Sequence, residues 1–374
     1  MTTEATLIEN VSLTLSPWPQ YEAGDVICRE VVDTIESVAS PIIIGLGLTG
    51  NAVGSASLLR VAGLRSRGIG HLLVAICVSD AIFLASLLPT WLGHRYGRGY
   101  DLYNSDGWCE LLSLTTMSSN FLSTWFTVAL GVERYVAVRH SRRHGRENRK
   151  PQTSKRSCGP TRTRVAIIAL TVLATVVFVN MVVNIGVVKR DDGAPVCVPL
   201  PPAVDVMHVL NNVDLVVNVI APGLIIAGLY SVIGVRLAVS RCRRGRAISR
   251  LAPPSTPRSA DGDDDGTTAC PTEIRLTRSA VLLSAVVVLL SAPSHALRTA
   301  HIVAQLFRLP VSVQTVGGSS VVQLVVREFF YASFAVPFFV VVASHSRIRR
   351  SIVLSVRLAL ESAWKRLRVA CSWR

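Results

Sequence analysis

The chain has 374 residues, of which 50% are hydrophobic and only 17% are charged, and its formal net charge is +15. The charged residues gather in short blocks between long apolar stretches, which excludes an ordinary soluble domain with charges scattered over its surface. The basic blocks contain almost no interleaved aromatic residues, so the positive charge does not indicate a nucleic-acid-binding protein.

Seven of the apolar stretches are long enough to cross a bilayer, which takes about 20 residues in a helix. They cover residues 38–59, 71–92, 109–133, 165–188, 209–235, 279–304 and 321–344. The expected fold is therefore an all-α membrane protein, a bundle of seven transmembrane helices spanning residues 38–344.

The charges between these stretches differ between the two sides. The segments expected on one side hold 30 Lys or Arg against 7 Asp or Glu: 60–71, 139–164, 236–278 and 345–374. Those expected on the other side hold 7 against 12: 1–38, 93–108, 189–208 and 298–320. Because Lys and Arg collect in the cytosolic loops of membrane proteins, we expect the N-terminus outside the cell and the C-terminus in the cytosol. The basic side would then face anionic lipid of the inner leaflet.

The segments outside the seven stretches have distinct characters. Residues 1–37 form an acidic tail, in which Asn10 begins a glycosylation sequon. The loop of about 242–272 contains prolines and an acidic run, and we expect it to be disordered. Residues 345–374 alternate apolar and basic residues at helical spacing, which predicts a short amphipathic helix on the inner membrane face.

In chain order, most stretches carry polar residues or prolines that are unusual within a membrane helix. These are Asn51 in the first, Asp80 in the second, Cys109 and the triplet Glu133-Arg134-Tyr135 in the third, Pro222 and Tyr230 in the fifth, Pro293 in the sixth and Pro337 in the seventh. With Cys197 in the loop after the fourth stretch, this ordered set resembles the rhodopsin-like (class A) G-protein-coupled receptors over most of residues 38–350. The segment from His71 to Trp91 looks most like receptors for peptides, including FMRFamide-type neuropeptides.

The resemblance implies a plasma-membrane receptor that binds an extracellular peptide and activates heterotrimeric G proteins. It also implies a disulfide between Cys109 and Cys197 that ties the loop to the third helix. Cys28 is left over, either as a free thiol or as an intermolecular partner.

The same resemblance assigns an activation switch to the cytosolic end. Arg134 would pair with Glu133 and with Glu273, which stands 20 residues before Pro293 at the base of the sixth helix. Breaking the Arg134–Glu273 pair would let that helix swing outward. Tyr230, Pro293 and Pro337 occupy further switch positions.

Asp80 is expected at mid-membrane near Asn51 and Ser123, where the family binds a sodium ion. The seventh stretch departs from the family pattern, because Asn-Pro-x-x-Tyr is replaced by Val336-Pro337-Phe338-Phe339-Val340. Two arrangements therefore remain open: a sodium ion, or a protonated Asp80 hydrogen-bonded to Asn51. No other metal or cofactor is expected.

Six polar residues in the outer halves of three stretches are candidates for a ligand pocket, because the two in each stretch lie three or four residues apart, about one helical turn. They are Thr116 and Asn120, Asp214 and Asn218, and His295 and Arg298. Thr116 stands where amine receptors carry an aspartate, which argues against a monoamine ligand. Asp214 and Arg298 suit a peptide, which offers both a cation and an anion.

Other classes fit less well. No nucleophile–base constellation or phosphate loop indicates an enzyme. The four lysines are absent from the seventh stretch, where an opsin needs one for retinal. A transporter would show internal repeats or a chain of acids. A receptor fold that binds ligand without signalling stays open, because no tryptophan lies in the fourth or sixth stretch and the seventh lacks its Asn and Tyr.

Overall fold

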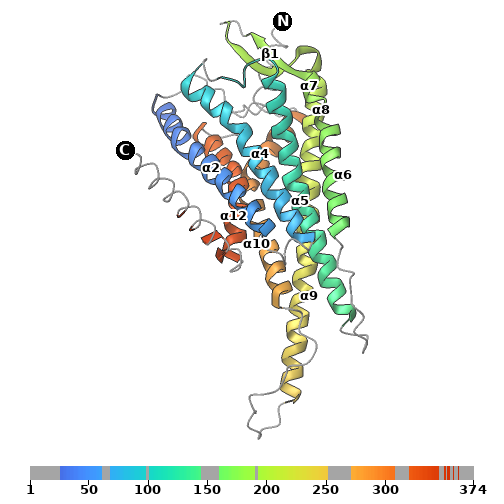
Figure 1. The fold of residues 1–374 in the computed structure, drawn as a ribbon. Helices are drawn as coiled ribbons and strands as arrows, with labels where there is room; N and C mark the ends of the chain where they lie inside the picture. Colours follow the sequence, from blue (N-terminus) through green and yellow to red (C-terminus); the bar gives the residue numbers. More distant parts are fainter. Residues whose placement is uncertain are drawn as a thin grey trace, which may run out of the picture.

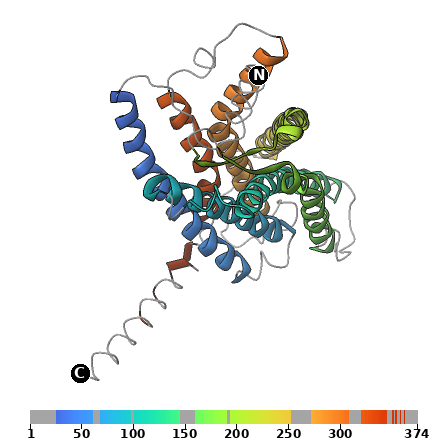
Figure 2. The same cartoon turned by 90° about the horizontal axis from the view of Figure 1, so that it is seen from above.

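The computed structural model describes residues 26–60, 68–97, 101–144, 160–189, 193–251, 271–307 and 320–344, together with positions 349, 350, 352, 353, 357 and 361. Seven long helical segments of the described residues form the bundle. The bundle is elongated in the side view of Figure 1 and is seen from above in Figure 2. The expectation of a seven-transmembrane helical bundle is confirmed. In chain order, the segments are α2 (Val26–Arg60), α4 (Gly68–Tyr96), α5 (Trp108–His144), α6 (Pro160–Phe178), a composite of α8 (Val204–Asp214), η3 (Leu215–Ile220) and α9 (Ala221–Leu251), then α10 (Pro271–Leu306) and α12 (Ser320–Ser344).

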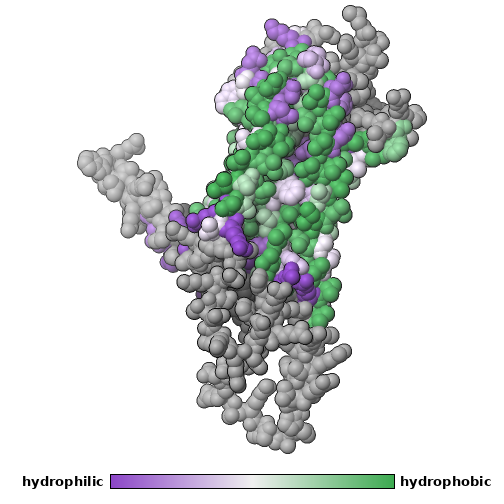
Figure 3. Space-filling view, turned by 90° about the vertical axis from the view of Figure 1, so that its right-hand side faces the viewer, coloured by the Kyte–Doolittle hydropathy of each residue, from purple (hydrophilic) through white to green (hydrophobic). Residues whose placement is uncertain are grey.

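Among the described residues, six helices are long and apolar enough to cross a membrane, and α5 is the one bundle helix that does not meet these limits. Its sequence contains many serines and threonines as well as Glu110, Glu133 and Arg134. The helix tolerates them because it lies inside the bundle, packed on α4, α6, α9 and α10. The other helices expose large apolar side chains outward, and Figure 3 shows the resulting hydrophobic surface between two more polar ends.

The packing places α2 between α4 and α12, while α10 lies against α12. Two glycines of α2 let it approach α12 closely, because a Cβ at Gly50 would lie 2.7 Å from the Phe338 ring and one at Gly54 would lie 3.0 Å from it. An apolar cluster fills the end of the bundle that contains Arg134, with Leu58, Leu130 and Leu283 at most 1% exposed. A second cluster lies under the disulfide at the opposite end.

That opposite end is closed by a β-hairpin. Strand β1 (Ile185–Lys189) pairs antiparallel with β2 (Pro195–Pro199), with Val187 opposite Cys197, and Gly193 adopts a φ of +77° in the turn. The expected fourth helix of 165–188 is therefore wrong at its C-terminal end, where α6 ends at Phe178 and only the short α7 (Met181–Asn184) follows. The Val- and Ile-rich run suits a strand as well as a membrane helix, and pairing with the proline-flanked β2 decides for the strand.

Other boundaries also differ from those expected. The first helix begins at Val26 and so includes the end of the 1–37 tail. The loop expected to be disordered over about 242–272 is helical at both edges, because α9 continues to Leu251 and α10 begins at Pro271.

Residues 252–270 lie outside the described part, as do Asn10 and the side chain of Cys28. The described positions of the expected amphipathic segment 345–374 are helical, and Arg357 pairs with Glu361 one turn later at 3.3 Å.

Candidate ligand cavity and signalling switch

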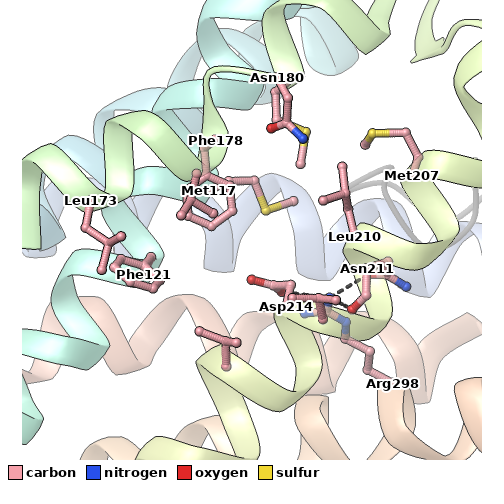
Figure 4. Close-up of a pocket in the computed structure, with 14 residues that line it drawn as sticks. Met117, Phe121, Leu173, Phe178, Asn180, Met207, Leu210, Asn211, Asp214 and Arg298 are labelled. Carbon is pink, nitrogen blue, oxygen red and sulfur yellow. Dashed lines mark hydrogen bonds and ion pairs between the residues drawn. The ribbon is translucent and has the colours of Figure 1, made fainter.

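A cavity of about 220 Å³ lies near the hairpin end, between α5, α6, α8, η3 and α10. Most of its lining is apolar. The labelled apolar side chains in Figure 4 are Met117, Phe121, Leu173, Phe178, Met207 and Leu210. Three polar residues, Asn211, Asp214 and Arg298, meet on one side of the cavity, where α8 approaches α10.

Arg298 links the two helices at this point. Its guanidinium forms a 2.7 Å ion pair with Asp214 and donates hydrogen bonds to the side-chain oxygen of Asn211 at 2.5 Å and to its backbone carbonyl at 3.1 Å. The Asp214 side chain is 12% exposed and that of Arg298 is 24% exposed. An ion pair in so apolar a cavity is screened less than one at the protein surface. The cavity therefore contains one anion and one cation that neutralise each other.

A π-helical segment positions this group. The turn η3 covers Leu215–Ile220, directly after Asp214 and before Pro222. Pro222 has no N–H to donate to the carbonyl of Asn218, and a widened turn accommodates the missing bond. The wider turn rotates α8 relative to α9. The sequence signal was Pro222 alone, which predicts a kink but not where Asp214 points.

The six predicted pocket residues do not all converge. Asp214 and Arg298 line the cavity, whereas the Thr116 hydroxyl lies 2.8 Å from Ser86 of α4, and His295 packs edge-on against Phe330 of α12 at 5.7 Å. Asn218 is buried in η3, and none of the described residues hydrogen-bonds its side-chain oxygen. Asn120 is half-buried on α5 and is not among the lining residues.

The mid-membrane polar group centres on Asp80, which is fully buried and accepts a 2.5 Å hydrogen bond from the Ser123 hydroxyl. Within the described part of the chain, its other carboxylate oxygen has no hydrogen-bond partner. Asn51 donates to the Phe334 carbonyl at 2.9 Å, and its side-chain oxygen has no hydrogen-bond partner among the described residues. The Asp80 carboxylate and the Ser123 hydroxyl offer oxygen ligands, the type that a hard cation such as sodium prefers.

Ser123→Ala tests the importance of that hydrogen bond. We expect it to destabilise the protein by about 1–3 kcal/mol, because the buried carboxyl loses a partner that no neighbour in the described part replaces. Thermal unfolding in detergent measures the loss. Ser55→Ala serves as the control, because Ser55 donates to the carbonyl of Asn51 within its own helix and its removal should have a much smaller effect.

Glu133 and Arg134 form a buried ion pair at the end of the bundle opposite the hairpin. The Arg134 guanidinium donates to the Glu133 carboxylate at 2.9 and 3.2 Å, and Arg134 and Glu133 are 2% and 7% exposed, respectively. Glu133 lies against Gly68 of α4, as does Thr163 of α6, so the pair sits where three helices meet. The side chain of Glu273, the third predicted member, lies outside the described residues.

Two tyrosines connect the same end to α9 and α10. Arg236 of α9 stacks over the ring of Tyr135 at 4.7 Å and donates to its hydroxyl at 3.2 Å. Tyr230 lies 2.8 Å from the Ser284 hydroxyl and donates to the Ala280 carbonyl at 3.2 Å, both on α10. Pro293 and Pro337 lie inside α10 and α12, as expected.

A family model for the seven-transmembrane receptors of the rhodopsin family matches residues 50–347. The match begins in the last third of α2 and runs to the end of α12. The chain belongs to the rhodopsin family of seven-transmembrane receptors. The protein is thus a multi-pass membrane receptor, as its resemblance indicated. No curated protein sequence matches the receptor significantly.

Sequence reasoning missed a charged network at the hairpin end. The Glu36 carboxylate of α2 pairs with Arg327 of α12 at 2.7 Å and with His94 of α4 at 3.2 Å. Glu328 accepts a 2.8 Å hydrogen bond from Ser40 and lies 3.5 Å from Arg327. The sequence signal that could have found it is the adjacent Arg327-Glu328 pair within an otherwise apolar helix, because such charges in a membrane segment require partners.

Proposed function

We propose that this receptor binds an extracellular peptide in the cavity beside Asp214 and Arg298 and activates heterotrimeric G proteins through outward movement of α10. The proposal places the hairpin end outside the cell and the Glu133–Arg134 end in the cytosol, in line with the excess of Lys and Arg in the loops at the latter end. The arrangement matches what a receptor needs: a ligand cavity at one end and a switch at the other.

The observation that carries the peptide assignment is the Asp214–Arg298 ion pair in the apolar cavity. A ligand that brings one charge only would leave the other residue unpaired in an apolar site, which is costly. A ligand that carries both an amine and a carboxylate or amide oxygen can replace the internal pair with two intermolecular contacts. Peptides have this chemistry, and the apolar walls suit their aliphatic or aromatic side chains.

The coupling half of the proposal rests on Arg134. The buried Arg134 is held by its neighbour Glu133 and could exchange this partner for another. A free-energy difference of a few kcal/mol between the two pairings would decide which receptor conformation is populated. Glu273 is the proposed partner on α10. Tyr230 already contacts α10 through Ser284 and Ala280, so movement of α10 must change that contact.

Arg298→Met is expected to lower the potency of an activating peptide by about 10- to 100-fold. This is the loss in affinity that corresponds to removing one charged hydrogen-bonding partner. The measurement is peptide-stimulated nucleotide exchange on G protein by the reconstituted receptor, after a screen of amidated peptides. Thr116→Ala is the matched control, because its hydroxyl faces Ser86 and its loss should leave the potency unchanged.

Equal potency in both variants would contradict the placement of the ligand. A peptide that binds tightly without stimulating exchange on any G-protein class would instead show a receptor that does not couple. One feature favours that second function: Val340 on α12 cannot hydrogen-bond Tyr230, which is the family's usual link between these helices.

A further inference from the structure

The charged network at the hairpin end contains three side chains of metal-binding type. Asp33 and Glu36 lie one turn apart on α2, and His94 lies near the C-terminal end of α4. One ligand atom from each lies within 4.8 Å of the other two. Asp33 and His94 are exposed and Glu36 is buried, so an ion could reach the group from solvent and be held by a side chain that is already fixed.

Glu36 is the decisive residue. It is 2% exposed, and its oxygen Oε1 receives the Arg327 guanidinium at 2.7 Å. The other oxygen, Oε2, lies 3.2 Å from His94 Nε2 in an ion pair, and among the described residues it accepts no hydrogen bond of good geometry. Buried carboxylate oxygens without a hydrogen bond are rare and call for an explanation, for which a bound ion is one accepted cause.

The distance between these two atoms fits a shared metal ion. In a tetrahedral zinc site with bonds of about 2.0–2.1 Å, neighbouring ligand atoms lie roughly 3.4 Å apart. The distance of 3.2 Å between Glu36 Oε2 and His94 Nε2 is already close to this ligand–ligand distance. Asp33 completes a third position through rotation of its exposed side chain, and water supplies the fourth, as in zinc sites with three protein ligands.

The charge of the network also favours a dication. Two acids, Glu36 and Glu328, lie within 3.5 Å of the single guanidinium of Arg327, and Asp33 adds a third acid beside Glu36. The acidic side chains therefore outnumber the arginine at this place. A divalent ion held by Glu36, Asp33 and His94 would add positive charge where the acids gather.

We propose that Asp33, Glu36 and His94 form a binding site for a divalent transition-metal ion, with zinc the best match. An imidazole nitrogen with two carboxylates is a ligand set that zinc accepts and that magnesium and calcium, which prefer oxygen alone, do not favour. The bound ion would bridge α2 and α4 beside the Arg327 contact to α12. This site is separate from the cavity at Asp214 and Arg298 and does not depend on the ligand proposed there.

The test is a zinc titration of the full-length receptor in lipid nanodiscs, followed by thermal unfolding. Zinc should raise the unfolding temperature as its concentration passes the dissociation constant, whereas magnesium and calcium should not. His94→Ala and Asp33→Asn should each weaken the zinc-dependent shift by at least about 10-fold in apparent affinity. Both side chains are exposed, so either variant should fold.

His208→Ala is the matched control, since it removes another histidine near the hairpin end, on α8, and should leave the titration unchanged. A zinc response that survives both His94→Ala and Asp33→Asn would place the ion elsewhere and overturn the proposal. An absent response in the unaltered receptor would show that Glu36 and His94 form an ion pair only.

Discussion

Replacing Cys197 by serine is expected to destabilise the receptor by about 4–5 kcal/mol. The disulfide between Cys109 and Cys197 closes a loop with a sequence separation of 88 residues. In chain-entropy models, losing this cross-link raises the conformational entropy of the unfolded chain, which lowers the free energy of unfolding by about 4–5 kcal/mol. The hairpin also loses its covalent link to α5. Thermal unfolding and the fraction of receptor at the cell surface measure the effect.

Cys77→Ala is the control for removing a sulfur atom. Cys77 is buried and unbridged, so its replacement should cost only a small cavity term of about 1 kcal/mol. Should both variants unfold at the same temperature, the disulfide would not be stabilising the fold. The hairpin retains one further contact in either case, because the Cys197 N–H donates to the side-chain oxygen of Asn104 at 2.8 Å.

Arg327→Met is expected to cost about 3–5 kcal/mol, because it removes the cation between two buried carboxylates while keeping most of the side-chain volume. Glu36 is 2% exposed and Glu328 is 7% exposed, and both lie within 3.5 Å of the guanidinium. Without it, the two buried carboxylates lose the cation that lies between them and repel each other. The free energy of unfolding of the purified receptor reports the loss.

A second substitution separates this cause from simple misfolding. Glu36→Gln in the Arg327→Met background removes one of the stranded charges, so the double variant should be more stable than Arg327→Met alone. Strictly additive losses would show that the two residues do not interact energetically. The same measurement decides how strongly α2 and α12 are coupled at the hairpin end.

The charged network illustrates why part of this receptor could not be predicted. Glu36 is the last of several acidic residues in the expected 1–37 tail and precedes the apolar stretch. Its charge therefore predicted a side chain exposed to solvent. In the structure α2 begins at Val26, and Glu36 is buried because α4 and α12 bring His94 and Arg327 to it. A buried charge is stable only with such partners, and they lie 58 and 291 positions away in the chain.

The ligand cavity shows the same limit. Residues four apart share a face in a regular α-helix, but the neighbour toward which that face turns depends on the rotation of each helix in the bundle. Thr116 turns to Ser86 and His295 to Phe330, while the apolar Met117 and Met207 line the cavity. The π-helical turn η3 rotates Asp214 toward Arg298 in a way that no periodicity indicates.

The amino-acid sequence by itself determined the number of membrane helices and the family. Runs of apolar residues long enough to span a bilayer can form only helices that satisfy their own backbone hydrogen bonds, so that signal is local and strong. The tertiary structure alone decided the hairpin after α6, the position of Asp214 against Arg298 and the partners of Glu36. These depend on helix rotation and on pairs of charges far apart in the chain, whose burial is favourable only once the whole bundle has assembled around them.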